Sequence, residues 1–116
     1  DVRHDDDVVI RPVASTSGEH TTWMLNRPTG NTIAMKMRLE QTKQTPTQRV
    51  HPGHDWFFVI EGRVTLLLGE REMIVETGEA AEFATMTPHA LQALGGPAEV
   101  IMIFDRDGQR AHVHHD

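Results

Sequence analysis

The sequence predicts an all-β chain that folds as a two-sheet sandwich of the jelly-roll β-barrel type. Apolar and polar residues alternate along many short segments, and turn-forming residues separate these segments at regular intervals. No window of a dozen residues keeps an apolar stripe at helical spacing. The chain of 116 residues is long enough for one domain whose core needs no covalent cross-links.

The alternation is clearest in residues 33–40, where the odd-numbered residues are apolar and Lys36, Arg38 and Glu40 lie on the opposite face. This is the pattern of a half-buried strand. The same reading along the chain predicts further strands at residues 8–13, 21–25, 56–60, 64–68, 73–75, 80–83, 90–94, 100–104 and 111–114.

Turn signals rich in glycine and proline separate the predicted strands. Gly69 opens the short polar connection 69–72, and it can adopt the positive φ of a hairpin turn between two neighbouring strands. Similar signals occur at residues 27–30, 51–53, 76–78, 95–97 and 105–108. The residues expected in the core include Ile33, Met35, Leu66, Leu68, Phe83, Ile101 and Ile103.

Composition excludes several classes of function. The chain has no cysteine, so disulfides, thiolate-bound zinc and cysteine nucleophiles are ruled out. The net charge is −6 and the 11 basic residues are scattered, so we expect no nucleic-acid binding by this domain. No segment approaches a membrane span, and we expect a cytoplasmic protein. Residues 1–7 are predicted to be a flexible acidic tail, and residues 8–116 a single domain.

Two histidines and one carboxylate stand in segments that a strand hairpin can bring together. His51 and Asp55 lie at the start of a predicted strand, and His89 ends a second glycine-led segment that begins at Gly78. Imidazole nitrogens and carboxylate oxygens are common ligands of divalent metals. The sequence therefore predicts a mononuclear metal site formed by His51, Asp55 and His89.

The segments that carry these residues resemble the two consecutive motifs of the cupin superfamily, which are small jelly-roll barrels. The motifs are Arg49–Gly62 and Gly78–His89, and the resemblance covers nearly the whole chain from about residue 8 onward. More narrowly, the chain is similar to the cupin domain often fused behind a bacterial helix-turn-helix regulator. The resemblance implies either a free-standing relative or the sensory half of a longer protein.

The chain departs from the cupin pattern at one ligand position. The family's first motif offers two histidines two positions apart, then a glutamate, and then a glycine seven positions later. Aligned on Gly62, Asp55 replaces the glutamate, His51 matches the second histidine and Arg49 stands in place of the first, while His89 matches the histidine of the second motif. A guanidinium cannot bind a cation. The remaining two histidines and one carboxylate suit zinc, iron, nickel or manganese, with positions left open for a ligand.

Three alternatives stay open for these residues. His51 and His89 could be hydrogen-bonded histidines of a barrel that holds no metal. His54 could replace the missing imidazole, although the alternation places it on the face opposite Asp55. Arg49 could be an exposed cation at the edge of a strand, form an ion pair with Asp55, or bind an anionic ligand through two parallel hydrogen bonds.

The ligand pocket is expected to include Arg49, Met35, Met37 and Phe57, although the two methionines are most simply core residues. Trp56 and Phe58 lie on the face opposite Asp55, where they would pack the sandwich or a homodimer interface.

Three classes of function fit these observations, since one fold hosts many chemistries. The first is a small-molecule-binding cupin with a role in transcriptional control. The second is a metal-dependent dioxygenase, isomerase or lyase that acts on a small anionic substrate. The third is a barrel without a ligand. Because the chain has no tyrosine and no cysteine, it offers few catalytic groups, and we favour binding over catalysis.

Overall fold

The computed structural model describes residues 7–105. These residues form nine β-strands and no helix: β1 (Ala14–Ser17), β2 (His20–Met24), β3 (Thr32–Leu39), β4 (His54–Glu61), β5 (Arg63–Leu68), β6 (Arg71–Glu76), β7 (Ala80–Ala84), β8 (His89–Ala93) and β9 (Ala98–Asp105). The all-β prediction is confirmed. Within this part of the chain there is no helix long and apolar enough to cross a membrane.

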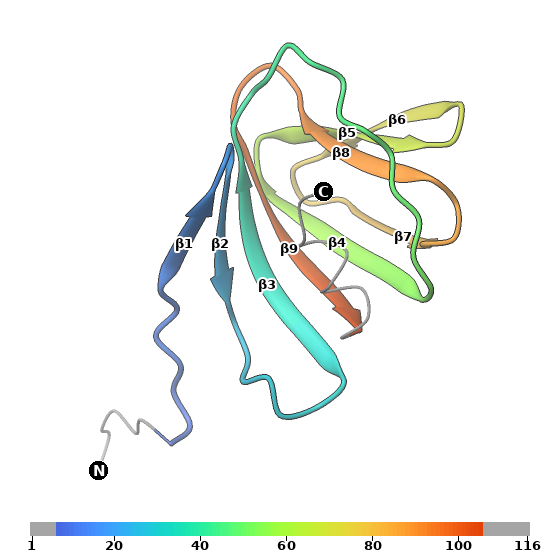
Figure 1. Ribbon diagram of the computed structural model, residues 1–116. Helices are drawn as coiled ribbons and strands as arrows, with labels where there is room; N and C mark the ends of the chain where they lie inside the picture. Colours follow the sequence, from blue (N-terminus) through green and yellow to red (C-terminus); the bar gives the residue numbers. More distant parts are fainter. Residues whose placement is uncertain (1–6, 106–116) are drawn as a thin grey trace.

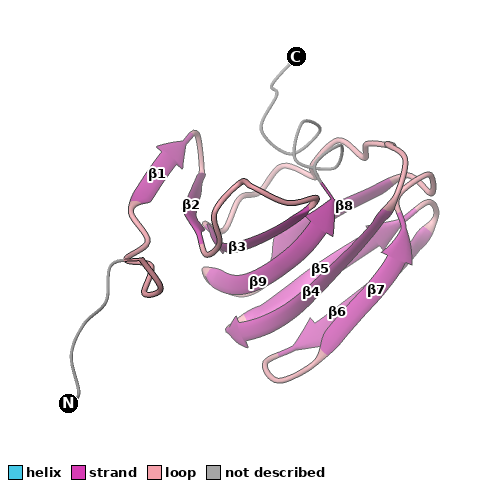
Figure 2. Ribbon diagram, turned by 90° about the horizontal axis from the view of Figure 1, so that it is seen from below, coloured by secondary structure: helices cyan, strands magenta, loops and turns pink. Residues whose placement is uncertain are grey.

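The strands form two antiparallel sheets that pack as a sandwich (Figures 1 and 2). The larger sheet has the order β1-β2-β3-β9-β4-β7, and the smaller sheet has the order β6-β5-β8. The last described strand, β9, lies between β3 and β4 and pairs with both. This long-range pairing makes β9 the centre of the large sheet, and it fixes which residues of β3 and β4 face the small sheet.

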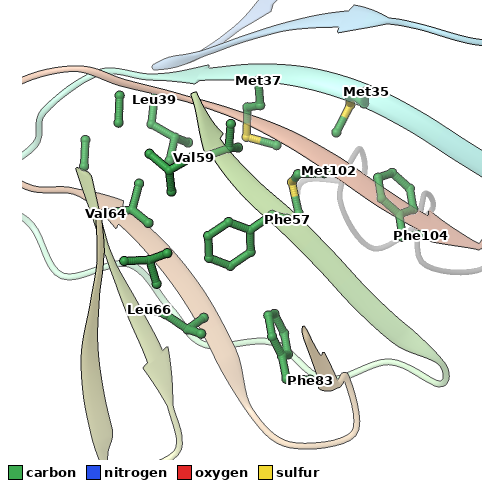
Figure 3. Close-up of a cluster of buried hydrophobic side chains, with 14 of the residues drawn as sticks. Met35, Met37, Leu39, Phe57, Val59, Val64, Leu66, Phe83, Met102 and Phe104 are labelled. Carbon is green, nitrogen blue, oxygen red and sulfur yellow. The ribbon is translucent and has the colours of Figure 1, made fainter. Parts of the chain in front are cut away.

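The core lies between the two sheets (Figure 3). Strands β3 and β4 alternate buried and partly exposed residues along most of their length, as expected for strands with one face toward the core. Phe57 and Val59 from β4 are fully buried, and Met102 of β9 is 1% exposed. Five of the residues predicted to be buried are confirmed: Ile33, Met35, Leu66, Leu68 and Phe83.

The predicted burial of Ile101 and Ile103 is wrong. Ile103 is 38% exposed and Ile101 is half-buried, whereas Val100, Met102 and Phe104 are in the core. Residues 100–104 are all apolar, so alternation alone could not say which face of this strand points inward. The polar residues that flank the run, Glu99 and Asp105, share the outward phase and were the available signal.

The beginning of the fold also differs from the prediction. Residues 8–13 form no strand, and Val8 and Val13 are 72% and 81% exposed. The first strand is instead β1, which pairs with β2 through a tight turn at Gly18. Pro12 lacks the amide hydrogen that a strand in a ladder donates. The predicted strand at 111–114 and residues 1–6 of the predicted tail lie outside the described residues.

Candidate metal centre

His51, Asp55 and His89 converge in the space between the two sheets. His51 lies three residues before β4, Asp55 is the second residue of β4, and His89 is the first residue of β8. All three are buried, with exposed fractions of 7%, 1% and 7%. One potential ligand atom from each side chain lies within 4.8 Å of the others. The predicted convergence of these three residues is therefore present in the structure.

Backbone pairing holds the segment that carries His51 against the rest of the site. Arg49 and His89 exchange two backbone hydrogen bonds, each of 3.0 Å, which form an isolated antiparallel bridge. The amide of His51 donates to the carbonyl of Thr85, and the amide of Thr85 donates to the carbonyl of Gly53, both at 3.0 Å. These bonds join the start of β4 to the segment between β7 and β8.

Gly53 makes the turn between His51 and Asp55 possible. Its φ is +113°, a value that side chains disfavour, and a Cβ at this position would overlap with the carboxylate of Asp105. The positive φ of Gly53 turns the chain between His51 and Asp55, and the alternation of inward and outward residues in β4 begins after this turn. Asp55 therefore faces inward, and His54, the first residue of β4, is exposed.

Hydrogen bonds to the backbone orient both imidazoles. The Nδ1 atom of His51 lies 3.2 Å from the carbonyl oxygen of Pro52, and that of His89 lies 3.0 Å from the carbonyl oxygen of Thr87. Because a carbonyl oxygen only accepts hydrogen bonds, these contacts favour the tautomer with the proton on Nδ1. The lone pair of each ring is then on Nε2, the atom that faces Asp55.

The distances from the Asp55 carboxylate to the two imidazoles fit a shared ion. The Nε2 atoms of His51 and His89 lie 3.9 Å and 3.8 Å from Oδ2 of Asp55. These separations are longer than an N–H···O hydrogen bond. Two atoms that each bind one ion at about 2.1 Å can be up to about 4.2 Å apart, so both pairs are within reach of a single ion. The buried carboxylate of Asp55 would also favour a cation at this position.

The three residues line a cavity of about 280 Å³. Arg49 is exposed and lines this cavity, as does Met37. Met35 and Phe57, which the sequence suggested as pocket residues, are 2% and 0% exposed, belong to the hydrophobic core and are not among the residues that line the cavity. Of the two methionines in β3, only Met37 therefore lines the cavity.

The sequence analysis did not assign several of the lining residues to the cavity, among them Phe83, Leu91 and His20. Phe83 was assigned only to the core, but its ring also packs against His89, with centroids 5.2 Å apart. Leu91 follows His89 at a spacing of two in β8, so its strand phase could have indicated it. His20 begins β2, and no motif in the sequence singled it out.

Comparison of the sequence with protein families matches residues 35–104 to the cupin domain. No curated protein sequence matches the chain.

Similar folds occur among solved structures. They include Fe(II) HppE (TM-score 0.72, 19% identity, 86% of this chain and 62% of that chain) and KdgF from Halomonas sp. (TM-score 0.67, 16% identity, 84% and 90%). They also include an HTH_3 family transcriptional regulator from Vibrio cholerae (TM-score 0.64, 17% identity, 75% and 51%). The chain spans about three fifths of the length of the HppE chains. At these identities the likeness shows the fold alone. With its two antiparallel sheets and a match over residues 35–104, the chain belongs to the cupin family.

Proposed function

We propose that this chain is a small-molecule-binding cupin domain that holds one divalent transition metal and has a sensory or regulatory role. The observation that carries the proposal is the buried cluster of His51, Asp55 and His89 at a cavity. Zinc, iron, nickel and manganese all suit two imidazoles and a carboxylate. Three protein ligands would leave coordination positions open toward the cavity, where a bound ion supplies Lewis acidity to an oxygen of the ligand.

The ligand that we propose is small and anionic. The cavity volume of about 280 Å³ is close to the lower end of the roughly 300–1,000 Å³ that is usual for ligand pockets. Arg49 lines this cavity, and the backbone bridge to His89 fixes its position relative to the metal candidates. A guanidinium recognises carboxylate and phosphate groups through two parallel hydrogen bonds. One end of an anion could thus contact Arg49 while another atom reaches the ion.

A sensory role is favoured over catalysis by the limited set of reactive groups. The chain has neither tyrosine nor cysteine, and Glu61 and Glu82 are exposed and do not line the cavity. The fold likeness to the HTH_3 family regulator is compatible with this role. The second candidate is a metal-dependent enzyme that acts on a small anionic substrate. The proposed open coordination positions and the fold likeness to Fe(II) HppE support it.

Metal content tests the first half of the proposal. Purified protein, loaded with zinc and then dialysed, should retain about one ion per chain by elemental analysis. His51→Ala should lose most of this metal, because it removes one of only three ligands. His54→Ala is the matched control, since this exposed histidine lies three residues away and should leave the stoichiometry unchanged. Equal loss in both variants, or wild-type protein without retained metal, would contradict the proposal.

Thermal shift measurements test the anionic ligand. Metal-loaded wild type should be stabilised by some members of a panel of small carboxylates and sugar phosphates, and Arg49→Ala should respond less. Arg49→Lys should also respond less, because an ammonium keeps the charge but cannot form the planar two-point contact. A full response of the alanine variant would show that Arg49 does not bind the ligand. Turnover of a stabilising compound, followed by proton NMR, would favour the enzyme over the sensor.

A further inference from the structure

Apolar side chains form most of the wall of the cavity beside the three metal candidates. Six large apolar residues line it: Met37, Leu39, Pro46, Phe83, Leu91 and Met102. Figure 3 shows four of the six between the two sheets. Apart from the metal candidates, the polar side chains that line the cavity among residues 7–105 come from His20, Thr47 and Arg49. The cavity thus combines a few polar groups with a largely apolar wall, which is the usual composition of a small-molecule site.

The apolar wall has a definite place relative to the metal candidates. On β8, Leu91 follows His89 on the same face of the strand, at about 7 Å. Leu39 and Leu91 also line a second hollow, and Ala93, the next residue on this face of β8, lines only that hollow. The order along β8 is therefore metal candidate, apolar wall and second hollow. A ligand whose head is bound at the ion would place its body against Leu91.

The charged groups of the cavity suit a carboxylate better than a phosphate. Arg49 is the only lysine or arginine among residues 7–105 that lines the cavity, and its backbone bridge to His89 places it beside a metal candidate. A carboxylate has two oxygens, which one guanidinium and one ion can satisfy. A phosphate group has three strong acceptor oxygens and carries up to two negative charges, so it needs more donors than this cavity offers. The acid head that fits these groups is therefore a carboxylate.

We propose that the ligand of this site is a short monocarboxylic acid with a hydrocarbon body, and not a sugar acid or a sugar phosphate. The carboxylate contacts Arg49 and the ion, and the body lies against Met37 and Leu91. A hydroxyl group on the body would be buried among apolar side chains without a hydrogen-bond partner, which is unfavourable. The flexible side chains of Met37 and Met102 can adapt to the shape of the body. This inference rests on the proposed function, because it narrows the ligand of the same site from small anions in general to one class.

Heteronuclear NMR titration of zinc-loaded wild type with a series of acids tests the apolar body. From propanoate through butanoate and pentanoate to hexanoate, the affinity should rise about fourfold with each buried methylene. The matched control is γ-hydroxybutanoate, which has the head and the size of pentanoate but ends in a hydroxyl. It should bind at least about tenfold more weakly than pentanoate. Equal affinities across all these acids would overturn this inference and leave the proposed anion site intact, whereas no binding of any acid would overturn both.

A change in the wall tests where the body lies. Leu91→Asn keeps the size of the side chain but places an amide in the wall, so the affinity for hexanoate should fall at least about fivefold. Acetate is too short to reach this residue, and its affinity should stay the same. Ile74→Asn is the control, because Ile74 is 55% exposed on β6 and does not line the cavity, so it should bind both acids as wild type does. An unchanged affinity of Leu91→Asn for hexanoate, or an equal loss for both acids, would overturn this placement of the body. The acid series on wild type decides the class of ligand even if Leu91→Asn does not fold.

Discussion

Phe57→Ala should reveal how strongly the core between the sheets stabilises the fold. Phe57 is fully buried in the middle of β4, between Met102 on β9 and Ala81 on β7, and its ring packs edge-on against Phe83 at 6.4 Å. Replacement of a buried phenylalanine by alanine removes the apolar transfer free energy and leaves a cavity, at a cost of about 3–5 kcal/mol. A chain of 116 residues has a free energy of unfolding of roughly 6–17 kcal/mol. The variant should therefore lose a large fraction of its stability.

Urea denaturation followed by circular dichroism measures this loss, and the neighbouring residue provides the control. Phe58 faces outward and is half-buried, so Phe58→Ala should reduce the free energy of unfolding by no more than about 1.5 kcal/mol. Because Phe57 does not line the cavity, the folded Phe57→Ala protein should still retain metal. Equal destabilisation by the two variants, or an unchanged stability with loss of metal in Phe57→Ala, would refute this assignment of the two faces.

Three further predictions concern the turns, a buried hydroxyl and proton competition. Gly62→Ala should lower the free energy of unfolding, measured by chemical denaturation, by at least about 2 kcal/mol, because Gly62 has a φ of +72° and a Cβ there would lie 2.6 Å from the Pro97 carbonyl oxygen. Gly69 has a similar φ but open space around it, so Gly69→Ala should lower the free energy of unfolding by only about 1 kcal/mol. Thr85→Val should leave the stability in thermal melts unchanged or raise it, because the Thr85 hydroxyl is fully buried and has no hydrogen-bond partner among residues 7–105. A loss of stability of more than about 1 kcal/mol would indicate that the hydroxyl has a partner. Zinc affinity, titrated by calorimetry, should fall as the pH is lowered from about 8 to about 5, since protons compete for the imidazole nitrogens; a constant affinity would argue against histidine ligands.

The sequence was a good guide where strands have one polar face. In β3 the charged even-numbered residues identify the outward face. In β4 both faces are largely apolar, and the place of Asp55 in the motif indicated the inward face, which the structure bears out. The sequence was a poor guide in β9, where residues 100–104 are apolar on both faces. There the pairing with β3 and β4 decides the phase, and this pairing is a long-range property.

The candidate site divides in the same way. His51, Asp55 and His89 were identifiable because their spacing matches two family motifs, and the structure brings them together. The cavity was less accessible to prediction, because strand phase cannot tell an inward residue that lines a pocket from one that packs the core. Met35 and Met37 share a face of β3, yet only Met37 lines the cavity. His20 reaches it from a strand far away in sequence.

Anomalous X-ray diffraction from crystals of metal-loaded protein tests the central claim most directly. Data collected on both sides of the zinc absorption edge should show one strong anomalous peak per chain between His51, Asp55 and His89. The peak should lie about 2.0–2.2 Å from the Nε2 atom of each histidine and from a carboxylate oxygen of Asp55. An anomalous peak bound only by other histidines, or no peak between these three residues in fully loaded crystals, would contradict the account.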